Sequence, residues 1–242
     1  MRDCPVLRAG PVAGLGDVDD RLTEIRDATV RVAPGCGIAE FSDVYLTITR
    51  SIQLHIRTGG FLADDGYLAR LDVVFANRYF DALRAWAGGG APPECWRLLF
   101  DLPAGGEVSG LQLAGGGVNA HINLDLAVAV VDTGREFGDA DLDTGRRHGD
   151  YTNINDIFAE QMDTLLRRLV EPRTGRDEPP EHLSLLGRMM TGIIAIARRH
   201  AWDDAVTLWP LPRRSDGWTA KEHHMDAVAC WFGRRLLVDL PG

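Results

Sequence analysis

The stretch VSGLQLAGGGVNAHINLDLAVAVV, residues 108–131, sets the expected fold because it is long and almost wholly apolar. It contains one histidine, His121, one carboxylate, Asp125, and no other ionisable side chain. Its Gly, Asn, His and Asp residues make it a poor membrane span. We therefore predict a central buried helix around 108–131, with polar groups that reach partners on two sides.

Helical periodicity also dominates the flanking sequence. The clearest case is 65–86, where Leu68, Leu71 and Phe75 recur at helical spacing. The other helices that we predict, separated by turns or polar loops, span 18–32, 39–57, 94–100, 151–170, 183–209 and 221–238. The glycines at 115–117 mark either a break in the central helix or a place where a neighbouring backbone or a ligand comes close.

These patterns predict an all-α fold, a single-domain helical bundle of about seven to eight helices. Residues 1–16, rich in Gly and Pro, are expected to be a flexible N-terminal tail, and 17–242 a single α-helical domain. The best linker candidate is EPRTGRDEPPE at 171–181, but it is short, which favours one domain over two.

The composition of the chain limits the kinds of partner and the cellular compartment that we expect. The chain of 242 residues has a net charge of -9, which argues against nucleic acid or an anionic membrane as the main partner. Its four cysteines are far apart and form no CxxC pair, and its first residues lack the apolar core of a signal peptide. We expect a cytoplasmic protein with free thiols whose partner is a small molecule; the sequence leaves a homo-oligomer open.

The pair His121 and Asp125 is the main candidate for a catalytic site. The two residues are four apart, so a helix places them on one face, one turn from each other. The carboxylate can orient the imidazole for proton transfer, both can bind a metal, or the pair can be a satisfied buried contact. Spacing alone leaves these three interpretations open, but a carboxylate here needs a partner nearby.

Other polar residues share helical faces with apolar ones and are candidates for contacting a substrate. Asn119 and Asn123 point roughly opposite to the His121 pair. Asn77 and Asp81 are four apart, although Asp81 would also suit a solvated face beside arginines. The predicted substrate-binding residues are Asn77, Tyr79, Asp81, Asn119, Asn123 and Tyr151.

A metal site is the alternative use of the same pair. His148 and Asp150 would complete a set of two histidines and two carboxylates with His121 and Asp125, suited to zinc or another divalent ion such as magnesium. The competing interpretation is a loop histidine followed by a helix N-cap at Asp150.

The expected function follows from these sites and from the motifs that are absent. The sequence has no GxGxxG, P-loop, GxSxG or HExxH pattern. We expect an enzyme that acts on a small, fairly apolar molecule by non-redox acid–base chemistry: cyclisation, isomerisation, elimination or hydrolysis. The alternatives are a metal-dependent hydrolase and a non-catalytic binding or scaffold protein.

Four blocks of the sequence carry a family resemblance. They are LDVVFANRYFDAL at 71–83, NAHINLDL at 119–126, HGDYTNIND at 148–156 and AWDDAVTLW at 201–209. Together they resemble the largely actinobacterial domain-of-unknown-function 5995 family, from about Phe41 to Trp209. The resemblance implies a helical cytosolic protein and a shared pattern that includes the candidate site residues, and it implies no activity.

Two narrower likenesses concern metals. The spacing of His121 and Asp125 is similar to part of the zinc-binding pattern of the phospholipase C and single-strand nuclease fold, but the second histidine is missing. Residues 155–159, NDIFA, with Asp163 are similar to the magnesium-binding motif of class I terpene cyclases, but Ala159 replaces the expected hydroxyl residue.

Overall fold

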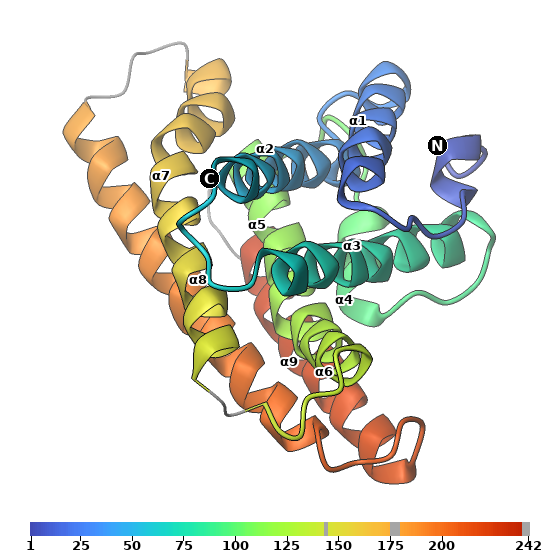
Figure 1. The fold of residues 1–242 in the computed structure, drawn as a ribbon. Helices are drawn as coiled ribbons and strands as arrows, with labels where there is room; N and C mark the ends of the chain where they lie inside the picture. The colour runs from blue at the N-terminus through green and yellow to red at the C-terminus, as the bar shows by residue number, and fades with distance from the viewer. Residues whose placement is uncertain (143–144, 175–179, 239–242) are drawn as a thin grey trace.

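The computed structural model describes residues 1–142, 145–174 and 180–238, and these residues form helices joined by turns, with no strand. The helices in chain order are the 3-10 helix η1 (Pro5–Arg8), α1 (Leu15–Val32), α2 (Gly37–Thr58), α3 (Asp65–Ala87), α4 (Glu94–Phe100), α5 (Gly110–Ala120), the π-helix η2 (His121–Leu126), α6 (Ala127–Glu136), α7 (Arg146–Thr174), α8 (Pro180–Leu208) and α9 (Asp216–Val238) (Figure 1). Because α5, η2 and α6 follow one another without a gap, the nine α-helices of this part of the chain form eight separate helical segments. The predicted all-α bundle is confirmed.

The central helix, residues 110–136, runs through the middle of the bundle (Figure 1). Helices α2 and α9 pack against its first part, and α3 and α8 against its last part. Every residue from Leu124 to Val131 is buried, so the predicted central helix is confirmed. An almost wholly apolar sequence suits this place because neighbours cover the helix on all sides.

The glycines at 115–117 let two neighbours approach the central helix closely. A Cβ atom at Gly117 would lie 2.4 Å from Cγ of Phe41 in α2, and one at Gly116 would lie 2.9 Å from Cδ2 of Leu237 in α9. The helix continues through all three glycines. They therefore mark a place of close approach, which was one of the two predicted alternatives. The groups that come close are side chains, whereas we expected a backbone or a ligand.

The π-helix η2 is a local departure from regular geometry that the sequence does not predict. In a π turn the backbone N–H groups bond five residues back instead of four, which widens the helix. The six residues of η2 begin with His121 and include Asp125. Single π turns inside α-helices occur frequently at functional sites.

Helix α7 begins earlier than expected, at Arg146. Asp150 consequently lies inside α7, and its prediction as the N-cap is wrong. Its two carboxylate oxygens instead accept hydrogen bonds from the backbone N–H groups of Ala63 and Asp64, both at 2.8 Å, just before α3. Of the expected linker, 171–174 belong to α7 and 180–181 to α8, while 175–179 lie outside the described residues.

Residues 1–14, expected to be part of a flexible tail, pack against the body of the molecule beside α3 (Figure 1). Leu7 is 2% exposed. The Asn77 side chain accepts a hydrogen bond from the N–H of Val12 at 2.8 Å and donates one to its carbonyl at 2.9 Å. An amide side chain pairs with a backbone unit in this way because each offers one donor and one acceptor.

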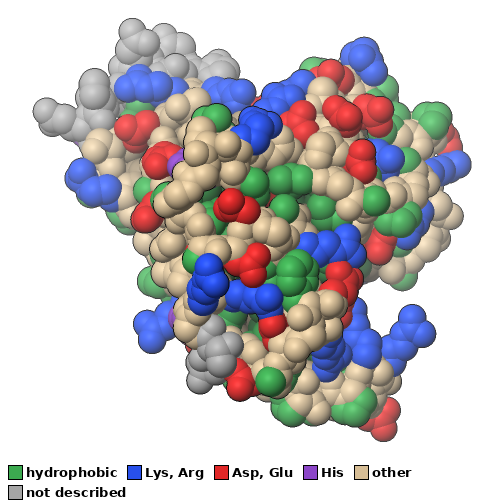
Figure 2. Space-filling view, in the orientation of Figure 1, with side chains coloured by type: hydrophobic (Ala, Val, Ile, Leu, Met, Phe, Trp, Pro, Cys, Tyr) green, Lys and Arg blue, Asp and Glu red, His purple; other side chains and the backbone are tan. Residues whose placement is uncertain are grey.

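The surface mixes charges of both signs, which are interspersed over the face shown in Figure 2. The four cysteines are free thiols, three of them buried. Within the described ranges, no helix combines the length and the apolar character needed to cross a bilayer.

Candidate functional site

Asp125 is the centre of a buried polar network. The side chain is 2% exposed, and it accepts hydrogen bonds from Nε of Arg78 at 3.2 Å and Nε1 of Trp96 at 2.9 Å. Its Oδ2 atom lies 3.1 Å from Nδ1 of His121. Arg78 supplies the opposite charge that a buried carboxylate requires, and the partner predicted for Asp125 is therefore present.

This network fixes the protonation state of His121. Burial lowers the pKa of His121, and Asp125 raises it by less, so the ring is neutral at pH 7. Because the carboxylate of Asp125 can only accept, the proton of the neutral ring belongs on Nδ1. The other nitrogen, Nε2, then carries a lone pair, and it is buried without a hydrogen-bond partner.

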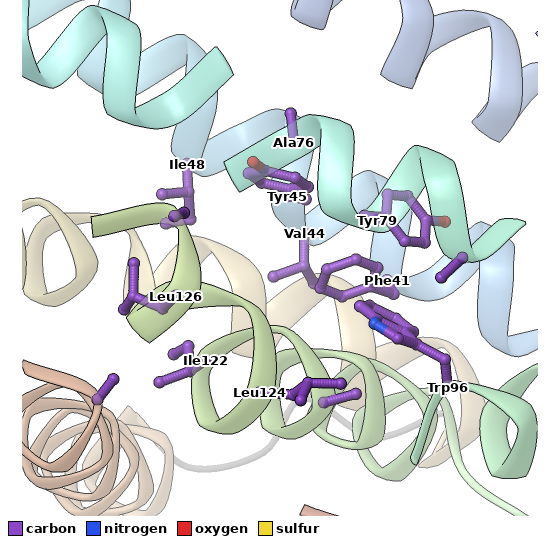
Figure 3. Packing of buried hydrophobic residues seen from close by; sticks show 14 of the residues in the cluster. Phe41, Val44, Tyr45, Ile48, Ala76, Tyr79, Trp96, Ile122, Leu124 and Leu126 are labelled. Carbon is purple, nitrogen blue, oxygen red and sulfur yellow. The ribbon is translucent and has the colours of Figure 1, made fainter. Parts of the chain in front are cut away.

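The His121 ring also lines a cavity of about 60 Å³, which lies between α2, α3, the central helix, α7 and α8. The wall is mostly apolar, with Ile48, Leu71 and Ile122 among its residues. Figure 3 shows Ile48 on α2 and Ile122 on the central helix, which face the space between these two elements. Phe75 stacks on the imidazole with ring centroids 3.4 Å apart and holds its orientation. The volume has room for several water molecules or a small apolar group.

Two further polar side chains, Tyr45 and Asp72, line the same cavity. Among the described residues, neither the hydroxyl of Tyr45 nor the buried Oδ2 atom of Asp72 has a hydrogen bond of normal geometry, although the two groups are close enough to shift each other's pKa. Burial raises the pKa of Asp72 to about 7, and the Tyr45 hydroxyl lowers it by less. Burial also raises the pKa of Tyr45. At pH 7 the cavity therefore contains a neutral base, a phenol and a carboxyl group that is protonated in a large fraction of molecules.

Arg198 of α8 completes the polar part of the wall. Its Nε donates to Oδ1 of Asn155 at 2.9 Å, and its Nη2 donates to the carbonyl of Tyr151 at 2.6 Å. Tyr151 in turn donates its hydroxyl to the carbonyl of Arg198. Tyr151 thus positions Arg198 next to the cavity and is not itself part of the wall.

The other residues predicted to bind substrate lie outside this cavity. Asn119 donates to the carbonyl of Ala229 in α9 at 2.7 Å, and Asn123 donates to Asn119 at 2.9 Å, on the side of the central helix that faces α9. The Tyr79 hydroxyl pairs with Ser42 at 2.9 Å, within the apolar core. These contacts join α9 and α2 to their neighbours.

Two residues of α3 are also distant from the His121 ring. Asn77 binds the backbone of Val12, as described above. Asp81 forms an exposed ion pair with Arg84 at 2.6 Å, which matches the solvated face considered as the alternative.

The four residues of the predicted metal set are not brought together. His148 packs against Trp202 with ring centroids 4.6 Å apart, and Asp150 binds backbone N–H groups near α3. In the part of the chain that the structure describes, no group of three or more His, Cys, Asp or Glu side chains is placed to hold a metal ion. The four side chains therefore do not form the proposed zinc or magnesium site.

Five residues of the network and the cavity were not among the sequence predictions: Tyr45, Asp72, Arg78, Trp96 and Arg198. Two of them carry a signal. Asp72 lies four residues after Leu68 and three before Phe75, within an apolar face, and Arg198 lies four residues after Ile194. A charged residue at a core position of a helix is a candidate functional residue. Arg78 and Trp96 carry no such signal because their roles come from contacts between helices.

The comparisons with known proteins bear on the family alone. A family model described as a family of unknown function, DUF5995, matches residues 15–239. No curated protein and no solved structure matches the chain. The match covers nearly all of the sequence, and the chain therefore belongs to the DUF5995 family.

Proposed function

We propose that this protein is an enzyme that moves a proton on a small, fairly apolar molecule bound in the cavity beside His121. The observation that carries the proposal is the buried Nε2 atom of His121, which has no partner while Nδ1 is held by Asp125. A lone pair left unsatisfied in an apolar cavity has a free-energy cost, which a bound ligand would offset. The same ring lines a cavity large enough for a substrate group.

Each polar group of the site has a distinct role in this proposal. Nε2 of His121 takes a proton from a carbon next to a carbonyl; the electron pair of that C–H bond forms a C=C bond, and the π pair of the carbonyl moves onto its oxygen to give an enolate. Asp125 stabilises the imidazolium that forms, and Arg78 forms an ion pair with its carboxylate. The protonated Asp72 and the Tyr45 hydroxyl are donors for the oxygen that gains charge.

This step is common to isomerisation, elimination and cyclisation, and it needs no redox cofactor. General base catalysis of this kind contributes about 10²–10⁴-fold in rate. The free thiols of the chain fit a reducing compartment, so we place the activity in the cytoplasm.

The test is deuterium exchange at the α-carbon of acetone, a ketone small enough for the cavity, followed by proton NMR in heavy water. We expect the protein to accelerate exchange, and His121→Gln to reduce the enzymatic rate at least 100-fold because the base is lost. His224→Gln, which changes an exposed histidine on α9, is the matched control and should exchange like the wild type.

Two results would contradict the proposal. Equal exchange rates for the wild type and His121→Gln would remove His121 from the chemistry. Acetone that binds without exchange, in a protein whose His121→Gln variant binds it equally well, would instead favour a non-catalytic binding protein.

A further inference from the structure

Arg198 is a buried cation without a negative partner. The residue is 5% exposed, and among the described residues no carboxylate forms an ion pair with it. Buried charges in proteins are normally paired, because an isolated one is expensive to remove from water. Burial lowers the pKa of Arg198, and Tyr151 raises it by less.

The neutral neighbours of Arg198 orient its guanidinium but do not neutralise it. Among the described residues, its two acceptors are an amide oxygen of Asn155 and a backbone carbonyl. The Tyr151 ring lies 4.3 Å from the guanidinium carbon and covers one face. A guanidinium has five N–H donors, so these two bonds leave donors for another acceptor.

Asp72 lines the same cavity but is not the missing counter-ion. No ion pair joins the two side chains, and Arg198 is not among the groups that shift the pKa of Asp72. A carboxylate paired with a guanidinium has a lowered pKa, whereas that of Asp72 is raised to about 7.

We propose that the cavity binds small apolar carboxylic acids, whose carboxylate pairs with Arg198 while the apolar body extends toward His121. This inference rests on the cavity of the proposed function and names its substrate class. Arg198 is the only Lys or Arg among the wall residues that the structure describes, so the site suits a single negative charge. A guanidinium binds a carboxylate through two parallel hydrogen bonds, which fixes the orientation of the acid relative to His121.

The test compares two small probes that share one propyl chain, butanoate and 1-butanol, by isothermal titration calorimetry at pH 7. We expect the wild type to bind the carboxylate at least 10-fold more tightly than the alcohol. Arg198→Gln should lose this preference and still bind the alcohol. Arg199→Gln, which changes the exposed arginine next along α8, is the matched control and should keep the preference.

Arg198 also joins α7 to α8, so Arg198→Gln can lose stability. Arg198→Lys keeps the charge without the planar fork, and it should retain a reduced preference for the carboxylate. The comparison of the two probes in the wild type does not depend on any variant.

The outcomes separate the two proposals. If the alcohol binds the wild type as tightly as the carboxylate does, the inference about Arg198 is overturned while the cavity of the proposed function remains. A preference for the carboxylate that survives in Arg198→Gln overturns it as well. If neither probe binds, the inference about Arg198 fails, and the exchange experiment decides the proposed function separately.

Discussion

The buried polar residues of this molecule differ in whether all of their polar atoms form hydrogen bonds. Asp125 has three donors around it, and two of these, Arg78 and Trp96, come from other helices. His121, Asp72 and Tyr45 each keep one buried atom without a partner. An unsatisfied buried polar atom costs about 1–3 kcal/mol, so three around one cavity are a substantial cost, which a bound ligand would offset.

The protonation of Asp72 makes a prediction about stability and pH. Its pKa is about 7 in the folded protein, against 3.8 for an ordinary aspartate. Below about pH 4 the group is protonated in both states and has no charge to bury. Between pH 4 and 7 the unfolded chain releases the proton while the folded protein keeps it, so stability falls by up to about 1.4 kcal/mol per pH unit. Asp72→Asn removes this loss.

Urea unfolding of the wild type and Asp72→Asn from pH 4 to pH 8 measures the effect. The advantage of Asp72→Asn should grow from pH 4 to 7 and then level off. The lowered pKa of His121 acts in the opposite direction, since it costs stability as the pH falls below 6.5, but it contributes equally to both proteins. A difference that is constant over this range would mean that Asp72 has an ordinary pKa.

At the scale of single residues, the sequence predicted the central pair and its need for a partner. The apolar context of Asp125 was sufficient for that prediction. Which donors reach it depends on how α3 and α4 cross the central helix, and periodicity within one helix carries no such information. For the same reason Asn77 and Asp81, which share the pattern of a polar pair on an apolar helix, were assigned to the cavity although they lie elsewhere.

At the scale of helices, the glycines of α5 set the distance between the central helix and its neighbours. Gly117 lets the Phe41 ring lie directly on the helix backbone. That ring lines the cavity and makes an edge contact with His121 at 5.6 Å between centroids. Packing at Gly117 therefore affects the shape of the site.

A methyl group at Gly117 should disturb this contact. Its Cβ would lie 2.4 Å from Cγ of Phe41, which is buried and cannot yield easily. We expect Gly117→Ala to lose about 1–3 kcal/mol of stability through overpacking. At Gly115 an added Cβ meets nothing within 4 Å, so Gly115→Ala should gain up to about 1 kcal/mol from helix propensity. Chemical denaturation of both variants measures this, and a stabilised Gly117→Ala would show that the contact is loose.

The helices themselves were largely predictable. The segments 65–86 and 94–100 match α3 and α4 to within one residue because their ends carry strong local signals. The start of α7 was missed by five residues, because Asp150 looks like an N-cap until its long-range bond to Ala63 and Asp64 is known. The π-helix could not be predicted because the sequence carries no recognised signal for a π turn.

At the scale of the whole molecule, the first residues close one side of the bundle. Leu7 is buried, and the backbone of Val12 is held by Asn77 of α3. We expected this segment to be loose because Gly and Pro disfavour regular structure, but a chain without regular structure can still be fixed by a few specific contacts.

Asn77→Ala tests how much this attachment contributes. The variant leaves the N–H and C=O of Val12 without their partner, and we expect it to lose about 1–3 kcal/mol of stability and to become more sensitive to proteolysis near Val12. Asp81→Ala, one turn further along α3 in an exposed ion pair, should change stability by about 0.5 kcal/mol or less. Binding of acetone should not change in either variant. A weaker affinity in Asn77→Ala alone would instead give Asn77 the substrate-binding role predicted from the sequence.

The π-helix makes the site depend on chain length as well as on side chains. A π turn contains about one residue more than an α turn. Loss of a single codon within His121–Leu126 would therefore restore an ordinary helix and leave Ala127–Glu136 in register with Gly110–Ala120. The protein would still fold as a bundle, but it would lose the widened turn that places His121 and Asp125, so natural variation in the gene should preserve the length of this turn.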